Sequence, residues 1–328
     1  MLVSASLLTS SLVVPEATAR PVAAEVPASA TQAVAAVELQ PAAGQFVPVA
    51  PASVINGVAV AAAGVSTVTV TGANGIPAAA QVSAVAVQVT AIGTTAAGYV
   101  QTYAAGTTRP TDSTNNFVTG RNTASYDVVP VSASGQISVY SSAASKVWVR
   151  LRGYFTSSSA VTAGSTFVPL AQTTVINNLA LAANGTSNYT FAGANGIPAA
   201  VDVAAVALEV TSAAPTAAGV LKAYPTGEAA PADAAVNYPV TQAQTNYETV
   251  RLSPAGQVTF SASGATKLTV RLRGYYSKPT ATTAAASYVP VAPATVVNNV
   301  ALAAAGTTTA TLAGANGVPA AATVAAVD

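Results

Sequence analysis

One eight-residue phrase recurs along this chain at a fixed spacing. GANGIPAA occupies residues 72–79 and again 193–200, and the close variant GANGVPAA occupies 314–321, so both separations are 121 residues (193 − 72 and 314 − 193). A second motif, which reads FVPVAP, FVPLAQ and YVPVAP in its three occurrences, has the same period. Internal repetition at one period indicates an array of similar structural units, and this constrains the fold more than any single residue does.

The two motifs divide the chain into repeats. We expect two complete repeats at 46–166 and 167–287 and an incomplete third at 288–328, which covers 328 − 287 = 41 of 121 residues. Residues 20–45 are rich in alanine and proline and are expected to form a linker. Residues 1–19 contain an apolar run followed by an Ala-x-Ala site, so we expect a secretory signal peptide there.

The apolar residues within each repeat recur at every second position. In the segment SAVAVQVTA, valine alternates with other residues from Val85 to Val89, and the second repeat places Val206, Leu208 and Val210 in the same positions. A period of two is typical of half-buried β-strands. We therefore predict an all-β protein made of tandem antiparallel β-sandwich domains, either jelly-roll or immunoglobulin-like.

The recurring phrase itself is predicted to be a turn between strands. Asn74 and Gly75 suit the positive φ angles of a tight turn, and Pro77 cannot donate a hydrogen bond to a neighbouring strand. The strand before each turn is expected to place Ala310 and Leu312 on its inner face in the third repeat. Because an incomplete sandwich leaves strand edges uncovered, we expect the chain to be a fragment of a longer array.

The composition excludes several classes of function. Charged residues make up 7% of the chain, and 12 basic and 11 acidic residues give a net charge of +1, so a nucleic-acid partner is not expected. Cysteine and histidine are absent, which removes thiolate chemistry and the usual general base at neutral pH. Asp112 and Asp127 lie in or beside polar loops without a sign of a shared pocket. We expect no enzyme, no catalytic or metal-binding residues, no cofactor and no transmembrane segment in the mature chain.

Several motifs, in this order, resemble a known family. The first repeat contains GANGIPAA, SAVAVQVT, TAAGYVQTYAAGTTRP, STNNF and VWVRLRGYF, and the second contains PTAAGVLKAYPTGEAAP and AVNYPV. This order is similar to a β-rich repeat module of secreted and cell-envelope actinobacterial proteins, over residues 46–328. The resemblance implies an exported module whose own role is poorly defined. The chain departs from the module at 54–57 and at 150–152, where the module usually has an Asp-Thr-Arg turn and an acidic last strand.

Seven side chains are candidates for contact with a ligand. Alternation along KVWVRLRGY places two arginines and the tryptophan on the outer face of the last strand, and the second repeat keeps only the arginines. The arginines are expected either to solubilise that face and pair with Asp127 or to bind an anionic envelope polymer. The aromatic residues are candidates to stack on a sugar ring or to pack in the protein. The candidates are Trp148, Arg150, Arg152, Tyr126, Tyr247, Arg271 and Arg273.

Two functions fit this sequence. The first is an exported, non-enzymatic structural or adhesive protein of the cell surface or extracellular space, in which several repeats raise the effective concentration of weak sites. The alternative is a carbohydrate- or cell-wall-binding module that accompanies a secreted hydrolase. The expected partners are cell-wall or extracellular glycans, together with self-association through the repeats.

Overall fold

The chain is described by a computed structural model for residues 44–160, 163–279, 288–289, 296–297, 300–315 and 318–320. The expected signal peptide, 1–19, and nearly all of the expected linker lie outside these described residues. The described residues belong to one compact unit, Glu38–Asp328. Among them, no helix has the length and apolar character needed to cross a membrane.

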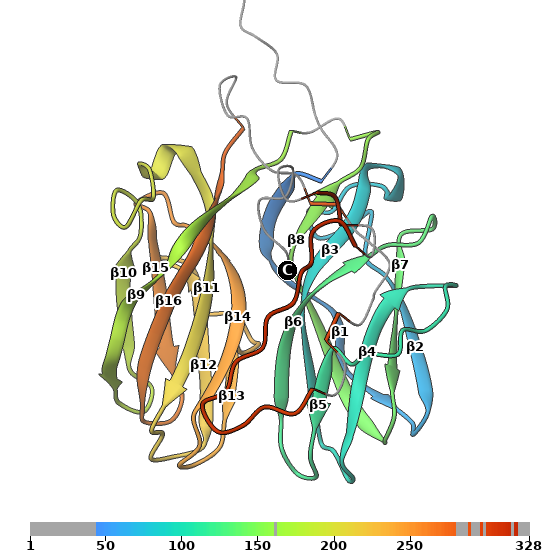
Figure 1. Ribbon diagram of the computed structural model, residues 1–328, viewed down its shortest axis with the longest axis horizontal. Coiled ribbons are helices and arrows are strands. Elements are labelled where there is room, and N and C mark those ends of the chain that lie inside the picture. The colour runs from blue at the N-terminus through green and yellow to red at the C-terminus, as the bar shows by residue number, and fades with distance from the viewer. Residues whose placement is uncertain are drawn as a thin grey trace, which may run out of the picture. The chain divides into compact units, whose positions relative to one another are not determined.

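The first repeat is a sandwich of two antiparallel sheets (Figure 1). Its strands are β1 (Phe46–Val60), β2 (Gly64–Thr69), β3 (Val82–Ile92), β4 (Gly98–Ala104), β5 (Asn115–Phe117), β6 (Thr123–Pro130), β7 (Gln136–Ser141) and β8 (Ser145–Thr156). One sheet has the order β1-β8-β3-β6, and the other has the order β2-β7-β4-β5. A short 3₁₀ turn, η1 (Ala79–Gln81), precedes β3.

The second repeat has the same plan (Figure 1). Its strands are β9 (Thr166–Leu181), β10 (Thr186–Thr190), β11 (Val203–Ala213), β12 (Gly219–Pro225), β13 (Val236–Tyr238), β14 (Gln244–Arg251), β15 (Gln257–Ala262) and β16 (Thr266–Ser277). Its sheets have the orders β14-β11-β16-β9 and β10-β15-β12-β13, and the 3₁₀ turn η2 (Ala200–Asp202) precedes β11.

The strand pairing identifies the type of sandwich. In repeat 1, β1 pairs with β8, β2 with β7, β3 with β6 and β4 with β5, as if one long hairpin had been wrapped around itself. Repeat 2 nests β9–β16, β10–β15, β11–β14 and β12–β13 in the same way. Eight strands wrapped into two sheets form a jelly roll, whereas the immunoglobulin-like arrangement divides its strands differently. The predicted tandem β-sandwich is confirmed, and each sandwich is a jelly roll.

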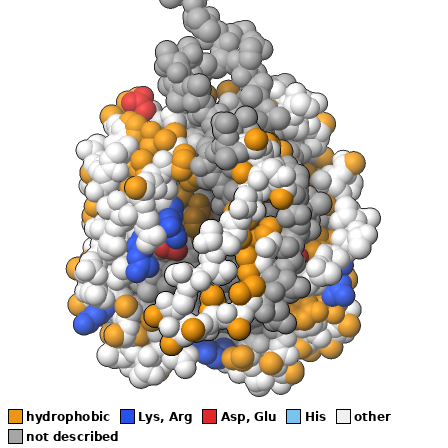
Figure 2. All heavy atoms as spheres, in the orientation of Figure 1, with side chains coloured by type: hydrophobic (Ala, Val, Ile, Leu, Met, Phe, Trp, Pro, Cys, Tyr) orange, Lys and Arg blue, Asp and Glu red, His pale blue; other side chains and the backbone are white. Residues whose placement is uncertain are grey.

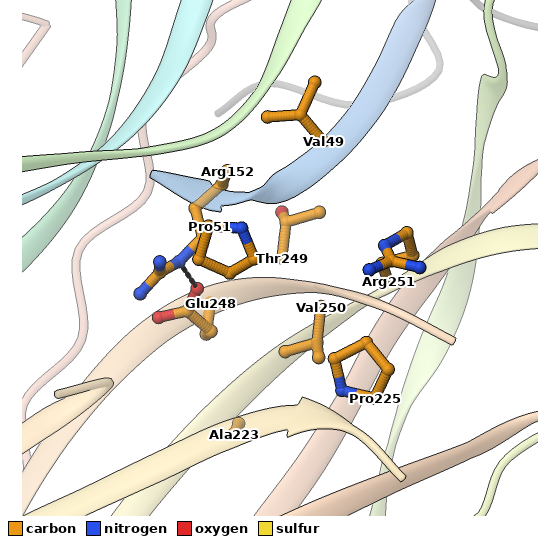
Figure 3. A pocket seen from close by; sticks show the side chains of 9 residues that line it. All are labelled: Val49, Pro51, Arg152, Ala223, Pro225, Glu248, Thr249, Val250 and Arg251. Carbon is orange, nitrogen blue, oxygen red and sulfur yellow. Dashed lines mark hydrogen bonds and ion pairs between the residues drawn. The ribbon is translucent and has the colours of Figure 1, made fainter. Parts of the chain in front are cut away.

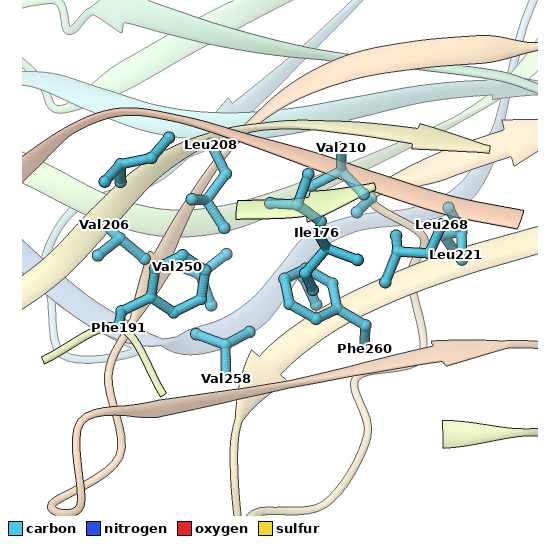
Figure 4. Close-up of a cluster of buried hydrophobic side chains, with 14 of the residues drawn as sticks. Ile176, Phe191, Val206, Leu208, Val210, Leu221, Val250, Val258, Phe260 and Leu268 are labelled. Atoms are coloured by element: carbon cyan, nitrogen blue, oxygen red, sulfur yellow. The ribbon is translucent and has the colours of Figure 1, made fainter. Parts of the chain in front are cut away.

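Each sandwich has its own apolar core between its two sheets. In repeat 2, Val206, Leu208 and Val210 of β11 point inward and are fully buried with Phe191 and Phe260 (Figure 4). The valines of β3 are buried in the same way in repeat 1. Full burial of one such side chain contributes about 1.5–3 kcal/mol. The period-two alternation of the sequence therefore selects the face of each strand that enters the core.

The recurring phrase forms the predicted turn. Asn74 and Gly75 have φ angles of 55° and 79°. The amide of Gly72 donates to the carbonyl oxygens four and five residues further along the chain, and the amides of Gly193 and Gly314 do the same. All three copies therefore close the same turn, which indicates that its conformation is determined locally.

The prediction of a strand before the third turn is wrong for the described residues. Residues 300–315 form turns and irregular structure, with Ala310 exposed and Leu312 half-buried. The physical reason is that a β-strand needs a neighbouring strand to pair with. In repeat 2 the equivalent strand, β10, is an edge strand hydrogen-bonded to β15, whereas among the described residues no strand pairs with residues 307–311. A lone strand has no sheet to join and is not stable by itself.

Candidate functional site

The two repeats pack the outer face of one sheet against each other. Ala84 and Ala86 of β3, and Ala205 and Ala207 of β11, alternate with the core residues of their strands and are nevertheless 0% exposed. They belong to one apolar cluster that contains residues of both repeats, including the aromatic residues Phe46, Phe155 and Tyr276. Because alanine side chains are short, two such outer faces can pack at close range.

Equivalent residues of the two repeats meet at this interface. Tyr126 and Tyr247 are 121 positions apart in sequence, and their rings lie edge to face with centroids 5.1 Å apart. Arg121 Nη1 donates a 3.0 Å hydrogen bond to Oε1 of Gln242, which is also its equivalent. In a two-fold arrangement, positions near the axis contact their own equivalents. The two repeats are therefore related by a pseudo-two-fold axis that passes near both pairs.

A cluster of four charged side chains crosses the interface. Arg152 of β8 donates through Nε to Glu248 Oε1 of β14 at 2.5 Å, and through Nη2 to Asp233 Oδ2. Arg150 Nε lies 3.8 Å from Asp233 Oδ1. None of the four side chains is more than 8% exposed. Figure 3 shows Arg152 and Glu248 pointing toward each other, with their contact as a dashed line. The four residues Arg150, Arg152, Asp233 and Glu248 are called the joint below.

A β-bulge aims Arg152 at repeat 2. Ala86 of β3 pairs with Gly153 of β8, but the next residue, Val87, pairs with Leu151, so that Arg152 is the extra residue. The second repeat has the same bulge at Arg273. A bulge interrupts strict alternation and re-aims the side chain of the extra residue.

Burial is the largest single influence on the pKa of each of Glu248, Arg152 and Arg150. Burial raises the pKa of Glu248 to about 7, and the charge of Arg152 offsets only part of this effect. Burial lowers the pKa of Arg152, but the charges of Glu248 and Asp233 together outweigh burial and raise that pKa above its usual value. Burial also lowers the pKa of Arg150, opposed by Asp233. Both guanidinium groups remain charged at neutral pH, because the ordinary pKa of arginine is far higher.

The pseudo-two-fold equivalent of the joint would pair Arg273 with Asp127, and this pair does not form. Instead, Asp127 accepts hydrogen bonds from the hydroxyl groups of Thr102 and Thr114, within its own repeat. Burial raises the pKa of Asp127, while both threonines act in the opposite direction. The carboxylate of repeat 1 is therefore hydrogen-bonded within its own sandwich.

The carboxylate of repeat 2 has no such partners in its own sandwich. The positions of the two threonines are occupied by Ala223 and Ala235, which have no side-chain donor. Glu248, one methylene longer than the aspartate it replaces, instead accepts a hydrogen bond from Arg152 of repeat 1 through Oε1, while its buried Oε2 has no hydrogen-bond partner. The loss of both threonines and the replacement of aspartate by glutamate thus explain why the joint forms on this side of the axis.

Arg271 and Arg273 of repeat 2 are paired within their own sheet. Arg273 Nη2 lies 2.7 Å from Glu209 Oε1, and Arg273 Nη1 donates to Gln172 at 2.7 Å. Arg271 Nη1 lies 3.9 Å from the other carboxylate oxygen of Glu209. Both arginine side chains are about 40% exposed. Repeat 1 has Gln88 in place of Glu209, so Arg150 and Arg152 lack the carboxylate that pairs with the equivalent arginines of repeat 2.

Trp148 lies half-buried beside the joint. The Arg150 guanidinium is 4.7 Å from the centre of the indole ring, which is the geometry of a cation–π contact. A side-chain carbon at Gly57 would come within 3.0 Å of the indole nitrogen. The ring therefore packs on its own sheet.

The expectation that Arg150 and Arg152 lie on a solvated face is wrong, and neither pairs with Asp127. They do lie on the outer face of β8, but repeat 2 covers that face. Sequence reasoning missed their actual partners, Asp233 and Glu248, because alternation distinguishes two faces of a strand without showing what covers each. One sequence difference could have indicated these partners: both threonine donors are lost in repeat 2, which leaves Glu248 without a partner in its own repeat.

The cavity beside the joint is very small. It has a volume of about 10 Å³ and is lined by residues of both repeats, among them Val49, Glu248 and Val250 (Figure 3). A cavity of this size holds about one water molecule. The joint can therefore connect the repeats, but it has no room for an organic ligand. No group of three or more acidic residues that could hold a metal ion occurs in the described part of the chain.

Comparison with known proteins adds no relative. No family model matches this chain, and no curated protein matches it.

Proposed function

We propose that this chain is an exported, non-enzymatic structural or adhesive protein of the cell surface or extracellular space. The observation that carries the proposal is the buried joint, in which Arg152 of repeat 1 binds Glu248 and Asp233 of repeat 2. Such a contact favours one fixed pairing of the two jelly rolls, because removal of one partner leaves a buried charge uncompensated at a cost of about 3–5 kcal/mol. The repeats then act as a single building block.

The contacts of the candidate ligand residues support a structural role for the sheet faces that carry them. Four of the seven, Arg150, Arg152, Tyr126 and Tyr247, lie in the interface between the repeats. Arg271 and Arg273 bind Glu209 of their own sheet.

The exterior suits an adhesive role. Uncharged side chains predominate on the face shown in Figure 2, with few acidic and basic groups. Along the chain, charged residues are 7% of the total. The hydroxyl and amide groups among uncharged side chains can hydrogen-bond to glycans without a strong electrostatic field. Export is supported by the apolar run and the Ala-x-Ala site within residues 1–19.

Calorimetry of the full chain tests the structural proposal. We expect the wild type to unfold in one transition, and Ala86→Asp to separate it into two, because an unpaired charge would be buried between the repeats without entering either core. Thr67→Asp, at an exposed position on the other sheet, is the matched control and should leave one transition. Two independent transitions in the wild type would contradict the proposal. Fractionation of the producing cells tests export: protein retained in the cytoplasm would contradict it.

The carbohydrate-binding alternative makes a different prediction for Trp148. If the indole ring is the sugar platform, retention of the full chain on insoluble polysaccharides or purified cell walls should disappear in Trp148→Ala. Because the ring packs beside Arg150, we expect any retention to be unchanged by this substitution.

A further inference from the structure

The sheet of repeat 1 that faces away from the joint carries a group of aromatic and basic side chains. On the outer face of β2-β7-β4-β5, Tyr99 of β4 and Tyr140 of β7 have ring centroids 6.1 Å apart at an interplanar angle of 43°. The guanidinium carbon of Arg109 lies 3.9 Å from the centre of the Tyr140 ring. Both rings are half-buried and the arginine is exposed. This group is called the tyrosine platform below.

A buried glutamine holds Arg109 in position. Gln101 pairs with Tyr140 across the sheet and is 2% exposed. Its amide nitrogen donates to the carbonyl oxygens of Pro110 and Asp112 at 2.7 and 2.5 Å. Its amide oxygen accepts from Arg109 Nη1 at 2.9 Å. The guanidinium is thus pre-positioned, which reduces the entropy lost when a ligand binds.

Arg109 has unused capacity to bind an anion. Apart from the bond to Gln101, no hydrogen bond of its guanidinium occurs among the described residues, and it forms no ion pair there, although Asp112 is only three positions away. An arginine fork with free donors matches a carboxylate in bidentate geometry. Neighbouring side chains on the same face include Asn116 opposite Tyr99, the apolar Val65 opposite Tyr140, and the polar Thr67 and Gln136 further along the sheet.

The fold does not require the platform, since repeat 2 builds the same sheet without it. The positions of Tyr99, Arg109 and Tyr140 are occupied in repeat 2 by Val220, Ala230 and Ser261. Two copies of one jelly roll share the residues that their common fold needs, so a stacked Tyr–Tyr–Arg group present in one copy alone points to recognition rather than folding.

We propose that the tyrosine platform of repeat 1 binds a polysaccharide that carries carboxylate groups. The negative faces of the tyrosine rings attract the slightly positive C–H groups on one side of a pyranose ring. Arg109 supplies the charge complement for a carboxylate on the same or the next sugar, and the surrounding hydroxyl and amide groups supply hydrogen bonds. This inference gives the adhesive part of the proposed function a site and a ligand class. It is independent of the joint, which lies on the other sheet.

Binding of the full chain to polygalacturonate tests the inference, with dextran as the neutral polymer and polyphosphate as the charged polymer without sugar rings. We expect binding to polygalacturonate alone. Tyr140→Ser and Arg109→Ala should each weaken it at least tenfold, and both install residues that the equivalent sheet of repeat 2 already accommodates. Lys146→Gln removes an exposed positive charge elsewhere on the same repeat and should leave binding unchanged.

The inference would be overturned by no binding to polygalacturonate, by equal binding to dextran or to polyphosphate, or by binding that survives Tyr140→Ser or Arg109→Ala. None of these results affects the calorimetric test of the joint, so failure of the platform and failure of the structural proposal are distinguishable.

Discussion

Arg152 and Arg273 occupy equivalent positions of the two repeats but have different surroundings, and this allows a matched test at the scale of one residue. Arg152→Met leaves Glu248 and Asp233 buried without their main counter-charge, so we expect a loss of about 3–5 kcal/mol in the free energy of unfolding. Arg273→Met removes a side chain that is 40% exposed, and we expect a loss of about 0–1 kcal/mol. Chemical denaturation of the full chain measures both.

The explanation of that loss can itself be checked. If the cost comes from the unpaired Glu248 carboxylate, adding Glu248→Gln to Arg152→Met should recover most of it, because the amide carries no charge and Asp233 still faces Arg150. A double variant as unstable as Arg152→Met alone would show that packing of the arginine, rather than its charge, provides the stabilisation.

Asp127 occupies the position in repeat 1 that Glu248 of the joint occupies in repeat 2. Its pKa predicts how the stability of the protein depends on pH. Burial raises the pKa of Asp127 in the folded protein, so folding takes up a proton and the carboxyl group costs stability once the pH exceeds the folded pKa. Asp127→Asn keeps an acceptor for Thr102 and Thr114 and removes the charge. We expect the variant to be more stable than the wild type at pH 7, with the difference narrowing toward pH 4. Denaturation series at both values measure it, and a difference that widens on acidification would contradict the assignment.

At the scale of the element, the bulge in β8 depends on a residue without a side chain. A Cβ at Gly153 would lie 2.4 Å from the ring of Phe46 and 2.6 Å from the carbonyl oxygen of Val47. Since Phe46 is fully buried and cannot move away, we expect Gly153→Ala to cost about 1–3 kcal/mol of unfolding free energy. Gly93→Asn is the control, because that position has open space and a φ of 60° that asparagine tolerates. Equal losses in the two variants would mean that the bulge has no special steric requirement.

Elements were more predictable from the sequence than their surroundings. The alternation that buries Val206, Leu208 and Val210 follows from the geometry of one strand, and the turn at Asn74 and Gly75 follows from local φ preferences, so both could be predicted. The bulge at Arg152 could not, because it depends on which residues of β1 and β3 lie opposite. The strand expected in the third repeat failed for a related reason: a strand is defined by its neighbours as much as by its own sequence.

For the whole molecule, the main feature is a symmetric interface made asymmetric by a few side chains. The alanine faces and the tyrosine pair obey the pseudo-two-fold axis, since the repeats share a backbone and a period. The charges do not, since Thr102, Thr114 and Gln88 of repeat 1 are replaced by Ala223, Ala235 and Glu209. The partners in the joint are 81 and 96 positions apart, so short-range sequence patterns cannot identify them. The candidate site was therefore only half visible in the sequence: its arginines were identified, but their partners were not.

The differences between the repeats predict that a second joint can be built on the opposite side of the axis. Thr102→Ala, Thr114→Ala and Asp127→Glu give repeat 1 the acceptor of repeat 2, and Glu209→Gln releases Arg273 from its own sheet. In this background Arg273 should bind the new glutamate across the interface. The cost of Arg273→Met should then rise from about 0–1 kcal/mol to about 3–5 kcal/mol, as expected when an exposed pair becomes a buried one. A double-mutant cycle between the two positions measures their coupling. An unchanged cost would mean that the backbone, rather than these four side chains, makes the interface asymmetric.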